Sequence, residues 1–260
     1  MPFAPTDIAN CALWLQAADL LNGGTLPSDG ATVTTWKDKS GNARDLSASS
    51  AGSLIPTFKA SAIGGKPGVQ FYGSGTATAN AAKIMQGGTV SLVQPGTLFV
   101  VTQLLVLNST GLQYLTDGNT ARWLIRNSDA VLDGTNHLCL YAGTALNGSV
   151  PTNGLLSPSV VTAQFNGLAS LSRFNGTQVT SGDAGTQGLD ALSVGGSPPN
   201  NAQCNGYICE VIVYAAALSG QQIQQVETYL GGSYGISLQE AWVVPWISPG
   251  PQHYRELKAA

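Results

Sequence analysis

Short segments rich in apolar and β-branched residues, separated by residues that favour turns, fill most of the 260-residue chain. This pattern predicts short β-strands, about a dozen of them, and little helix. The predicted strands span residues 13–19, 33–37, 68–72, 89–93, 97–107, 112–115, 120–125, 137–141, 159–165, 170–174, 177–180, 191–194 and 207–214. Many short strands joined by turns indicate an all-β protein built as an antiparallel sandwich of two sheets.

Two dipeptides mark the hairpins of this sandwich. Asp117-Gly118 and Asn175-Gly176 each lie between two predicted strands. Both dipeptides tolerate positive φ at the two central positions of a hairpin turn, which matches the twist of paired strands. We therefore expect a two-residue turn at each place.

One helix is expected, near the end of the strand region. Ser219 and Gln222 form a capping-box pair at its start, and Gly231-Gly232 is expected to end it. Four residues at helical spacing form its apolar face: Ile223, Val226, Tyr229 and Leu230. This single short helix should cover one side of the sandwich.

The character of the chain changes after about residue 238. Residues 1–238 fit one sandwich domain, whereas residues 239–260 form an extended tail rich in proline and tryptophan, which excludes a helix or a central strand. Interfaces favour buried aromatic residues, so the tail is predicted to dock on a partner. The predicted partner-docking residues are Trp242, Val244, Trp246 and Ile247. We expect other proteins of an assembly, or further copies in a homo-oligomer, as partners.

Composition narrows the classes of function. Only 10% of the residues are charged and the net charge is −3, without any run of Lys or Arg. Nucleic-acid binding rests on clustered cations, so it is not expected. The longest apolar run, residues 98–107, is too short to insert through a bilayer, which takes about 20 residues. The first ten residues show no secretory signal pattern. Such an uncharged surface fits a virion surface or, alternatively, an extracellular location.

Three segments resemble the concanavalin A-like, laminin G-like jelly-roll superfamily of the bacterial and phage surface type. LWLQAAD at 13–19 with VTTWKDKSGN at 33–42 is similar to the opening motif of that superfamily. RFNGT at 173–177 resembles a hairpin of the family, and EVIVY at 210–214 resembles its closing strand before the helix. The resemblance implies a jelly-roll sandwich with a binding or structural role, and it carries over no enzymatic site.

Two functional hypotheses follow from these features. The first is a non-enzymatic structural protein of a virus particle, a phage capsid decoration or fibre component, docked through its tail. The alternative is a carbohydrate-binding adhesion module for host or surface glycans. A glycan-cleaving enzyme would need two suitably spaced carboxylates, and the sequence offers no such pair, so we expect no enzyme.

A carbohydrate site, if present, is predicted around the first hairpin. Trp123 beside Arg122 is the candidate for an exposed aromatic platform, because a flat ring can stack on a sugar face. Asp117 and Asn119 at the hairpin tip would supply polar contacts, to a sugar or to Ca²⁺.

Other candidate residues have simpler interpretations. Asp38 and Asp45 flank a Ser-Gly-Asn turn; they could ligate Ca²⁺, but a local turn in which Asp38 binds backbone amides is favoured. Glu210 in its apolar strand is interpreted as structural, because a buried carboxylate needs hydrogen bonds or a cation. We expect no cofactor and no metal site.

The remaining candidates for chemistry are weak. The Gly-x-Ser-x-Gly pattern at 231–235 follows a helix, whereas a nucleophile elbow precedes one. His137 stands alone in a strand and is interpreted as structural. An Asn-Gly turn between Cys204 and Cys209 would leave the second thiol off-register for a bridge, so free thiols are favoured over a disulfide.

Overall fold

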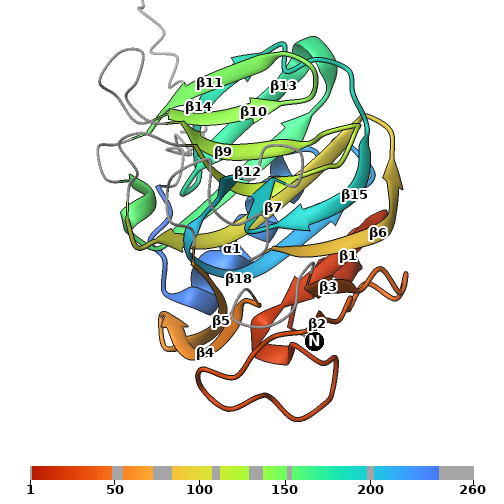
Figure 1. The fold of residues 1–260 in the computed structure, drawn as a ribbon. Helices are drawn as coiled ribbons and strands as arrows, with labels where there is room; N and C mark the ends of the chain where they lie inside the picture. The colour runs from red at the N-terminus through yellow and green to blue at the C-terminus, as the bar shows by residue number, and fades with distance from the viewer. Residues whose placement is uncertain are drawn as a thin grey trace, which may run out of the picture.

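Two antiparallel β-sheets packed face to face form the body of the molecule (Figure 1). This computed structural model describes residues 2–48, 55–72, 84–106, 112–128, 137–150, 154–197 and 202–239. The all-β sandwich with one C-terminal helix that the sequence predicts is confirmed. The predicted tail, with Trp242, Val244, Trp246 and Ile247, lies outside the described residues.

The first sheet has eight strands, seven of them in one continuous order. That order is β14 (Thr177–Gly182), β13 (Ser170–Phe174), β12 (Ser159–Phe165), β7 (Gly96–Leu104), β18 (Asn205–Tyr214), β5 (Lys66–Tyr72) and β4 (Thr57–Ile63). The eighth strand, β1 (Cys11–Gln16), also pairs with β18. The first and the last strand of the described residues are therefore paired within this sheet.

The second sheet also has eight strands. Its order is β11 (Ala145–Ser149), β10 (His137–Tyr141), β9 (Leu124–Ser128), β8 (Gln113–Asp117), β15 (Leu189–Val194), β6 (Met85–Leu92), β3 (Leu46–Ala48) and β2 (Thr35–Trp36). A small separate ribbon pairs β16 (Gly196–Ser197) with β17 (Ala202–Gln203). Single-turn 3₁₀ helices occur at Pro5–Asp7, Ala17–Asp19, Gly154–Leu156 and Gly167–Ala169.

Strand β7 is buried on both of its faces. This explains why apolar residues follow one another without interruption from Leu98 to Val101. Leu98 and Val100 point into the main core between the sheets. Phe99 and Val101 alternate with them and belong to a second core on the opposite face of the same sheet. A strand that buries both faces needs apolar residues at successive positions.

Helix α1 (Gly220–Tyr234) covers that second core. Its apolar residues Ile223, Val226 and Leu230 pack there, on the side of the first sheet away from the second (Figure 1). The expected capping box is present, since the Ser219 hydroxyl accepts from the Gln222 amide at 3.3 Å and the Gln222 side chain accepts from the Ser219 amide at 2.9 Å.

The predicted end of the helix is wrong by one turn. The helix continues through Gly231 and Gly232 to Tyr234, and Gly235 ends it with a left-handed φ of 64°. A Cβ atom at Gly231 would lie 2.9 Å from the side chain of Leu238. Gly231 therefore permits the close passage of the chain that follows the helix, whereas the capping role belongs to Gly235.

Of the expected two-residue turns, one is confirmed. Asn175 and Gly176 have φ values of 46° and 83° and join β13 to β14. Strands β8 and β9 also pair as predicted, but β8 ends at Asp117 and β9 begins only at Leu124, so their connection is a longer loop.

The sequence predicts that the Asn205-Gly206 dipeptide forms a turn, but it does not. Both residues lie inside β18. A Cβ atom at Gly206 would lie 2.3 Å from the carbonyl oxygen of Gln103, so this glycine allows close approach of the neighbouring strand.

Candidate functional site

The outer face of the second sheet gathers aromatic and charged side chains from three adjacent strands. Successive residues of a strand point to opposite faces. Leu115, Ile125 and Leu140 face the main core, whereas Tyr114 and Leu124 form a separate cluster. Tyr141, which pairs with Leu124 across β9 and β10, packs against that cluster. We call these outward residues, together with Asp117, Arg122 and Arg126, the outer-face cluster.

An ion pair between Arg122 and Asp117 lies in this cluster. The Arg122 guanidinium donates through Nε to one carboxylate oxygen at 2.8 Å and through Nη2 to the other. The Gly118 amide donates to the same carboxylate. Asp117 is fully buried, whereas the Arg122 side chain keeps 18% of its surface exposed. The hydrogen bonds to Asp117 raise the pKa of Arg122 above its ordinary value, so the guanidinium stays charged and fixed.

The loop that carries Arg122 is held by a second carboxylate. Asp190 accepts hydrogen bonds from the amides of Asn119, Thr120 and Ala121, at 3.0, 2.8 and 2.8 Å to Oδ1. Because three successive amides are fixed by one side chain, the loop presents the exposed Asn119 in a defined position. Asp190 is thus a support of the cluster that the sequence pattern did not single out.

Two guanidinium–tyrosine contacts complete the cluster. The Arg122 guanidinium lies 5.5 Å from the ring centre of Tyr141. The Arg126 guanidinium lies 5.7 Å from the ring centre of Tyr114 and donates to its hydroxyl at 3.2 Å. Such contacts are within the range of cation–π attraction. Sequence reasoning missed Tyr114 and Tyr141, because the face to which each points depends on strand register.

Trp123, predicted to be an exposed platform, is fully buried, and that prediction is wrong. Its ring stacks on Phe165 with centroids 5.4 Å apart, and its Nε1 donates to the carbonyl of Gln187 at 2.9 Å. Gly96 leaves room for the ring, since a Cβ atom there would overlap it. Trp123 precedes Leu124, which faces outward, so strand alternation turns the indole toward the core. Of the other predicted sugar contacts, Asp117 is also fully buried, where it binds Arg122, so its prediction as a sugar contact is wrong as well. Asn119 is exposed and Arg122 is half-buried.

Asp38 forms the local turn that the sequence favoured. Its carboxylate accepts from the amides of Ser40 and Trp14 at 2.8 and 3.0 Å, and from the amide of Arg44 at 3.0 Å. Asp45 accepts a hydrogen bond from Lys37 at 2.6 Å and another from the Asp38 amide at 2.9 Å. Burial is the largest single effect on the pKa of Asp45 and raises it, but these contacts together bring the pKa below its ordinary value. Within the described ranges, no three His, Cys, Asp or Glu side chains are grouped so that they could hold a metal ion.

The cysteines are free thiols in this structure, and Cys204 and Cys209 do not form a bridge. Burial raises the pKa of Cys204 to about 12, so its reactive thiolate form is scarce at neutral pH. Ser233 of the Gly-x-Ser-x-Gly pattern lies in the last turn of α1, which is not the geometry of a nucleophile elbow.

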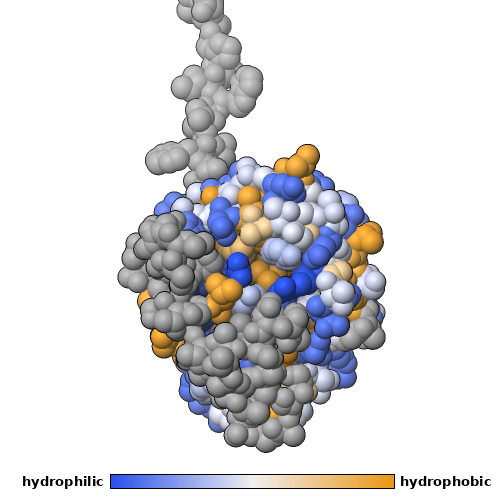
Figure 2. All heavy atoms as spheres, turned by 45° about the horizontal axis from the view of Figure 1, so that its top comes forward, coloured by the Kyte–Doolittle hydropathy of each residue, from blue (hydrophilic) through white to orange (hydrophobic). Residues whose placement is uncertain are grey.

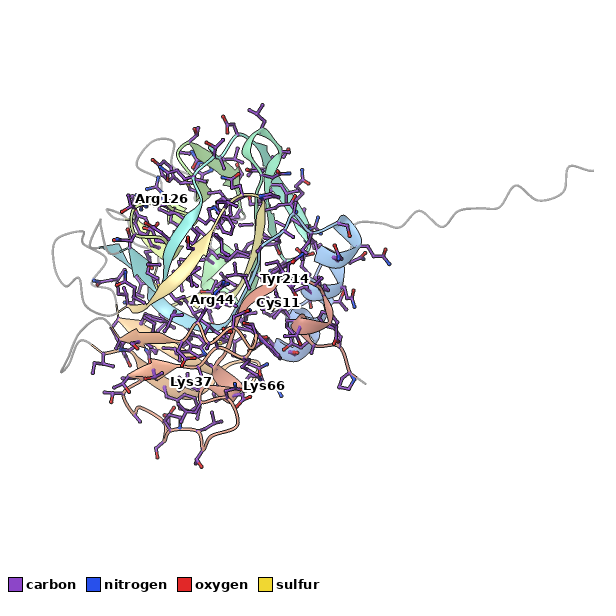
Figure 3. The ribbon with its side chains drawn as sticks, turned by 90° about the vertical axis from the view of Figure 1, so that its right-hand side faces the viewer. Cys11, Lys37, Arg44, Lys66, Arg126 and Tyr214 are labelled. Carbon is purple, nitrogen blue, oxygen red and sulfur yellow. The ribbon has the colours of Figure 1, made fainter. Side chains whose placement is uncertain are left out.

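The surface bears mixed polarity. Where the face drawn in Figure 2 is coloured, pale and blue residues predominate, with apolar residues between them. Figure 3 places Arg126 at the opposite end of the molecule from Lys37 and Lys66, so these cations are dispersed. No helix in the described part of the chain is long and apolar enough to cross a membrane.

No family model and no curated protein sequence matches this chain. Solved structures do match it. The Trypanosoma rangeli sialidase is 12% identical with a TM-score of 0.57, over 89% of this chain and 34% of the sialidase. The chain therefore spans about a third of the length of that enzyme.

Two smaller domains are similar in the same way. Domain 4 of an extracellular arabinanase from Geobacillus stearothermophilus, solved with arabinotriose, is 13% identical with a TM-score of 0.52, over 77% of this chain and 100% of that domain. The binding domain of a Paraclostridial mosquitocidal protein is 14% identical with a TM-score of 0.57, over 87% of this chain and 53% of the other.

At these identities the similarities establish a shared fold. The chain shares its β-sandwich fold with part of a sialidase, with a domain of an arabinanase and with a mosquitocidal binding domain. The lectin-like sandwich predicted from the sequence motifs is thus supported at the level of fold. None of these three structures bears on a virion role, so capsid decoration and virion-surface localisation stay predictions.

Proposed function

We propose that this protein is a non-catalytic carbohydrate-binding module that uses the outer-face cluster of its second sheet. The observation that carries the proposal is the Arg122 guanidinium, fixed by Asp117 and lying 5.5 Å from the ring centre of Tyr141. Asn119 is exposed on the β8–β9 loop that also carries Arg122. Ligand sites commonly combine a few fixed polar groups with aromatic surface. This is the alternative of the two functional hypotheses, and the related sandwiches in a sialidase and an arabinanase support it over the virion role.

The chemistry of the cluster suits sugar hydroxyl groups. The Arg122 guanidinium is planar and fixed by Asp117 and by a hydrogen bond to the Ser197 hydroxyl at 3.3 Å, so the N–H donors of Nη1 are aimed in a defined direction. The Asn119 side chain is exposed and can both donate and accept. The Tyr141 ring offers a flat apolar surface beside them. Because the Arg122 guanidinium is already positioned, a ligand would lose little free energy in ordering it.

The cluster is better suited to binding than to hydrolysis. Glycoside hydrolysis needs a pair of carboxyl groups that act as acid, base or nucleophile. The Asp117 carboxylate accepts hydrogen bonds from Arg122 and from the Gly118 amide, so it holds the arginine in place and is not free to act as an acid or base. Related folds include both enzymes and binding domains, so the non-catalytic role rests on this geometry.

A glycan array tests the proposal. The purified chain should bind at least one class of glycan, and Tyr141→Ala should weaken that binding about ten-fold, the cost of removing an aromatic anchor. Tyr72→Ala is the matched control, because Tyr72 is an exposed tyrosine at the end of strand β5 in the other sheet. An array without any bound glycan, or equal losses from both substitutions, would contradict the proposal.

A further inference from the structure

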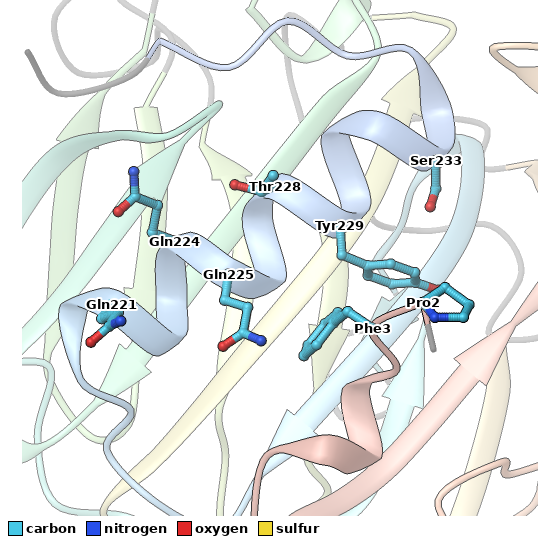
Figure 4. Close-up of a pocket in the computed structure, with 8 residues that line it drawn as sticks. All are labelled: Pro2, Phe3, Gln221, Gln224, Gln225, Thr228, Tyr229 and Ser233. Carbon is cyan, nitrogen blue, oxygen red and sulfur yellow. The ribbon is translucent and has the colours of Figure 1, made fainter.

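A groove lies between the N-terminal segment and the solvent side of α1 (Figure 4). It is on the opposite side of the sandwich from the outer-face cluster, because α1 covers the first sheet and the cluster lies on the second. Its volume is about 720 Å³, which is within the usual range of small-molecule sites. The lining residues are Pro2, Phe3, Gln221, Gln224, Gln225, Thr228, Tyr229 and Ser233.

No lining side chain carries a charge. The exposed face of a surface helix ordinarily bears charged residues. Helix α1 has one charged residue, Glu227, and it is buried in an ion pair with Arg173. The exposed positions facing the groove instead carry amide and hydroxyl groups, which donate and accept hydrogen bonds as sugar hydroxyls do.

Tyr229 borders the groove, and its ring is held in place by hydrogen bonds to residues of the first sheet. The Tyr229 hydroxyl donates to the buried Glu210 carboxylate at 2.9 Å and accepts from the Gln16 side chain at 3.0 Å. These bonds hold the ring in place while its edge borders the groove (Figure 4). The tyrosine is therefore positioned before any ligand arrives, which lowers the entropic cost of binding.

Phe3 extends the same aromatic surface. Its ring meets Tyr229 edge to face, with centroids 5.6 Å apart. The segment that carries Phe3 is anchored, since the Tyr214 hydroxyl donates to the Pro5 carbonyl at 2.8 Å and the Ala4 amide donates to Asp7 at 2.8 Å. An aromatic side chain remains half-exposed here on a fixed backbone.

We propose that this groove is a second saccharide site, one that takes a neutral oligosaccharide. The inference rests on the proposed carbohydrate-binding function and extends it to a separate surface. Amides along α1 would bind hydroxyl groups, while Phe3 and Tyr229 would contact the apolar C–H face of a sugar ring. An acidic sugar would be disfavoured, because its carboxylate would lose water without meeting a cation.

The dimensions favour more than one sugar ring. Gln221 and Ser233 mark the two ends of the lined helix face, about 18 Å apart along the axis at 1.5 Å per residue. With a site on each side of the sandwich, one molecule can engage two chains of a glycan surface, and the second contact gains from the first.

The test is an NMR titration of the full chain with isotope-labelled glutamine side chains. Maltotriose, cellotriose and arabinotriose are the neutral probes, and sialyllactose is the acidic one. At least one neutral probe should shift the side-chain amide signals of Gln221, Gln224 and Gln225, and sialyllactose should not. Phe3→Ala should weaken the affinity about ten-fold, the cost of truncating an aromatic anchor.

Two further variants keep the test decisive. Thr228→Ala changes an exposed helix position and should preserve the fold, yet it should weaken the same binding. Val93→Ala alters an apolar side chain that is 82% exposed away from the groove and should have no effect. The inference is overturned if no neutral probe moves the glutamine signals, or if Phe3→Ala and Thr228→Ala bind like the parent.

Two other results distinguish failure of the second site from failure of the proposed carbohydrate-binding function. Glycan-array binding that Tyr141→Ala removes, with unshifted groove signals, would overturn the second site and leave the proposed function standing. A blank array together with unshifted signals would contradict both. Shifts produced by raising the protein concentration alone would assign the groove to contacts between copies of this chain and overturn the saccharide site.

Discussion

At the scale of single residues, Glu210 shows how a buried acid is accommodated. Its carboxylate accepts hydrogen bonds from Trp14 Nε1 at 2.7 Å, from the Tyr229 and Tyr234 hydroxyls at 2.9 and 2.8 Å, and from Gln16. Burial raises the pKa of Glu210, and these hydrogen bonds offset the rise in part. The interpretation of Glu210 as structural fits this network, which joins β1, β18 and α1.

A pH-dependent stability follows from this residue. With a folded pKa above the unfolded value of about 4.3, the stability that the protonated acid contributes is fully present below that value. It is lost as the pH rises through the folded pKa, by about 1.4 kcal/mol for each pH unit between the two values. We expect the free energy of unfolding of the parent to fall relative to Glu210→Gln as the pH rises above about 4, the unfolded pKa of a glutamate. Urea denaturation at several pH values measures this difference, and a constant difference would contradict the assignment.

At the scale of elements, α1 is fastened to the first sheet by a buried ion pair. Arg173 of β13 donates to both oxygens of Glu227, at 2.9 and 3.0 Å, and the Thr162 hydroxyl of β12 donates to the same carboxylate at 2.8 Å. The sequence predicted the apolar face of this helix but not the ion pair, because the two partners are 54 residues apart. Local spacing carries no information on such a contact.

Removing the carboxylate should therefore loosen the helix. Glu227→Ala leaves the partly exposed Arg173 guanidinium with the Gly176 carbonyl as its acceptor and without a carboxylate, which we expect to lower the free energy of unfolding by about 2 kcal/mol. Gln225→Ala is the matched control on the exposed side of the same helix and should change it by less than about 0.5 kcal/mol. Chemical denaturation of both variants measures the two values. Equal small effects would show that the ion pair contributes little.

At the scale of the whole molecule, sequence pattern was sufficient for the class of fold and insufficient for the site. Periodicity and turn residues located most strands and the helix, since these are local properties of the chain. The face of Trp123 depends on where β9 begins, and the Asp117-Gly118 signal placed that start at residue 120, whereas β9 begins at Leu124. The face of Tyr141 depends on how β10 pairs with β9. A shift of one residue exchanges core and surface along a strand, so the neighbouring arginine could not show which face Trp123 takes.

The distribution of apolar cores and free cysteines predicts how the stability of the molecule responds to a thiol reductant. Its stability comes from two extensive apolar cores on either side of the first sheet, and all four cysteines are free thiols. We therefore expect the melting temperature to be unchanged by a thiol reductant, as measured by calorimetry with and without it. Burial raises the pKa of Cys11 and Cys204 to about 12, so alkylation by iodoacetamide at neutral pH should be slow in the folded protein and fast after unfolding. A lower melting temperature under reducing conditions would reveal a stabilising disulfide and contradict the assignment of free thiols.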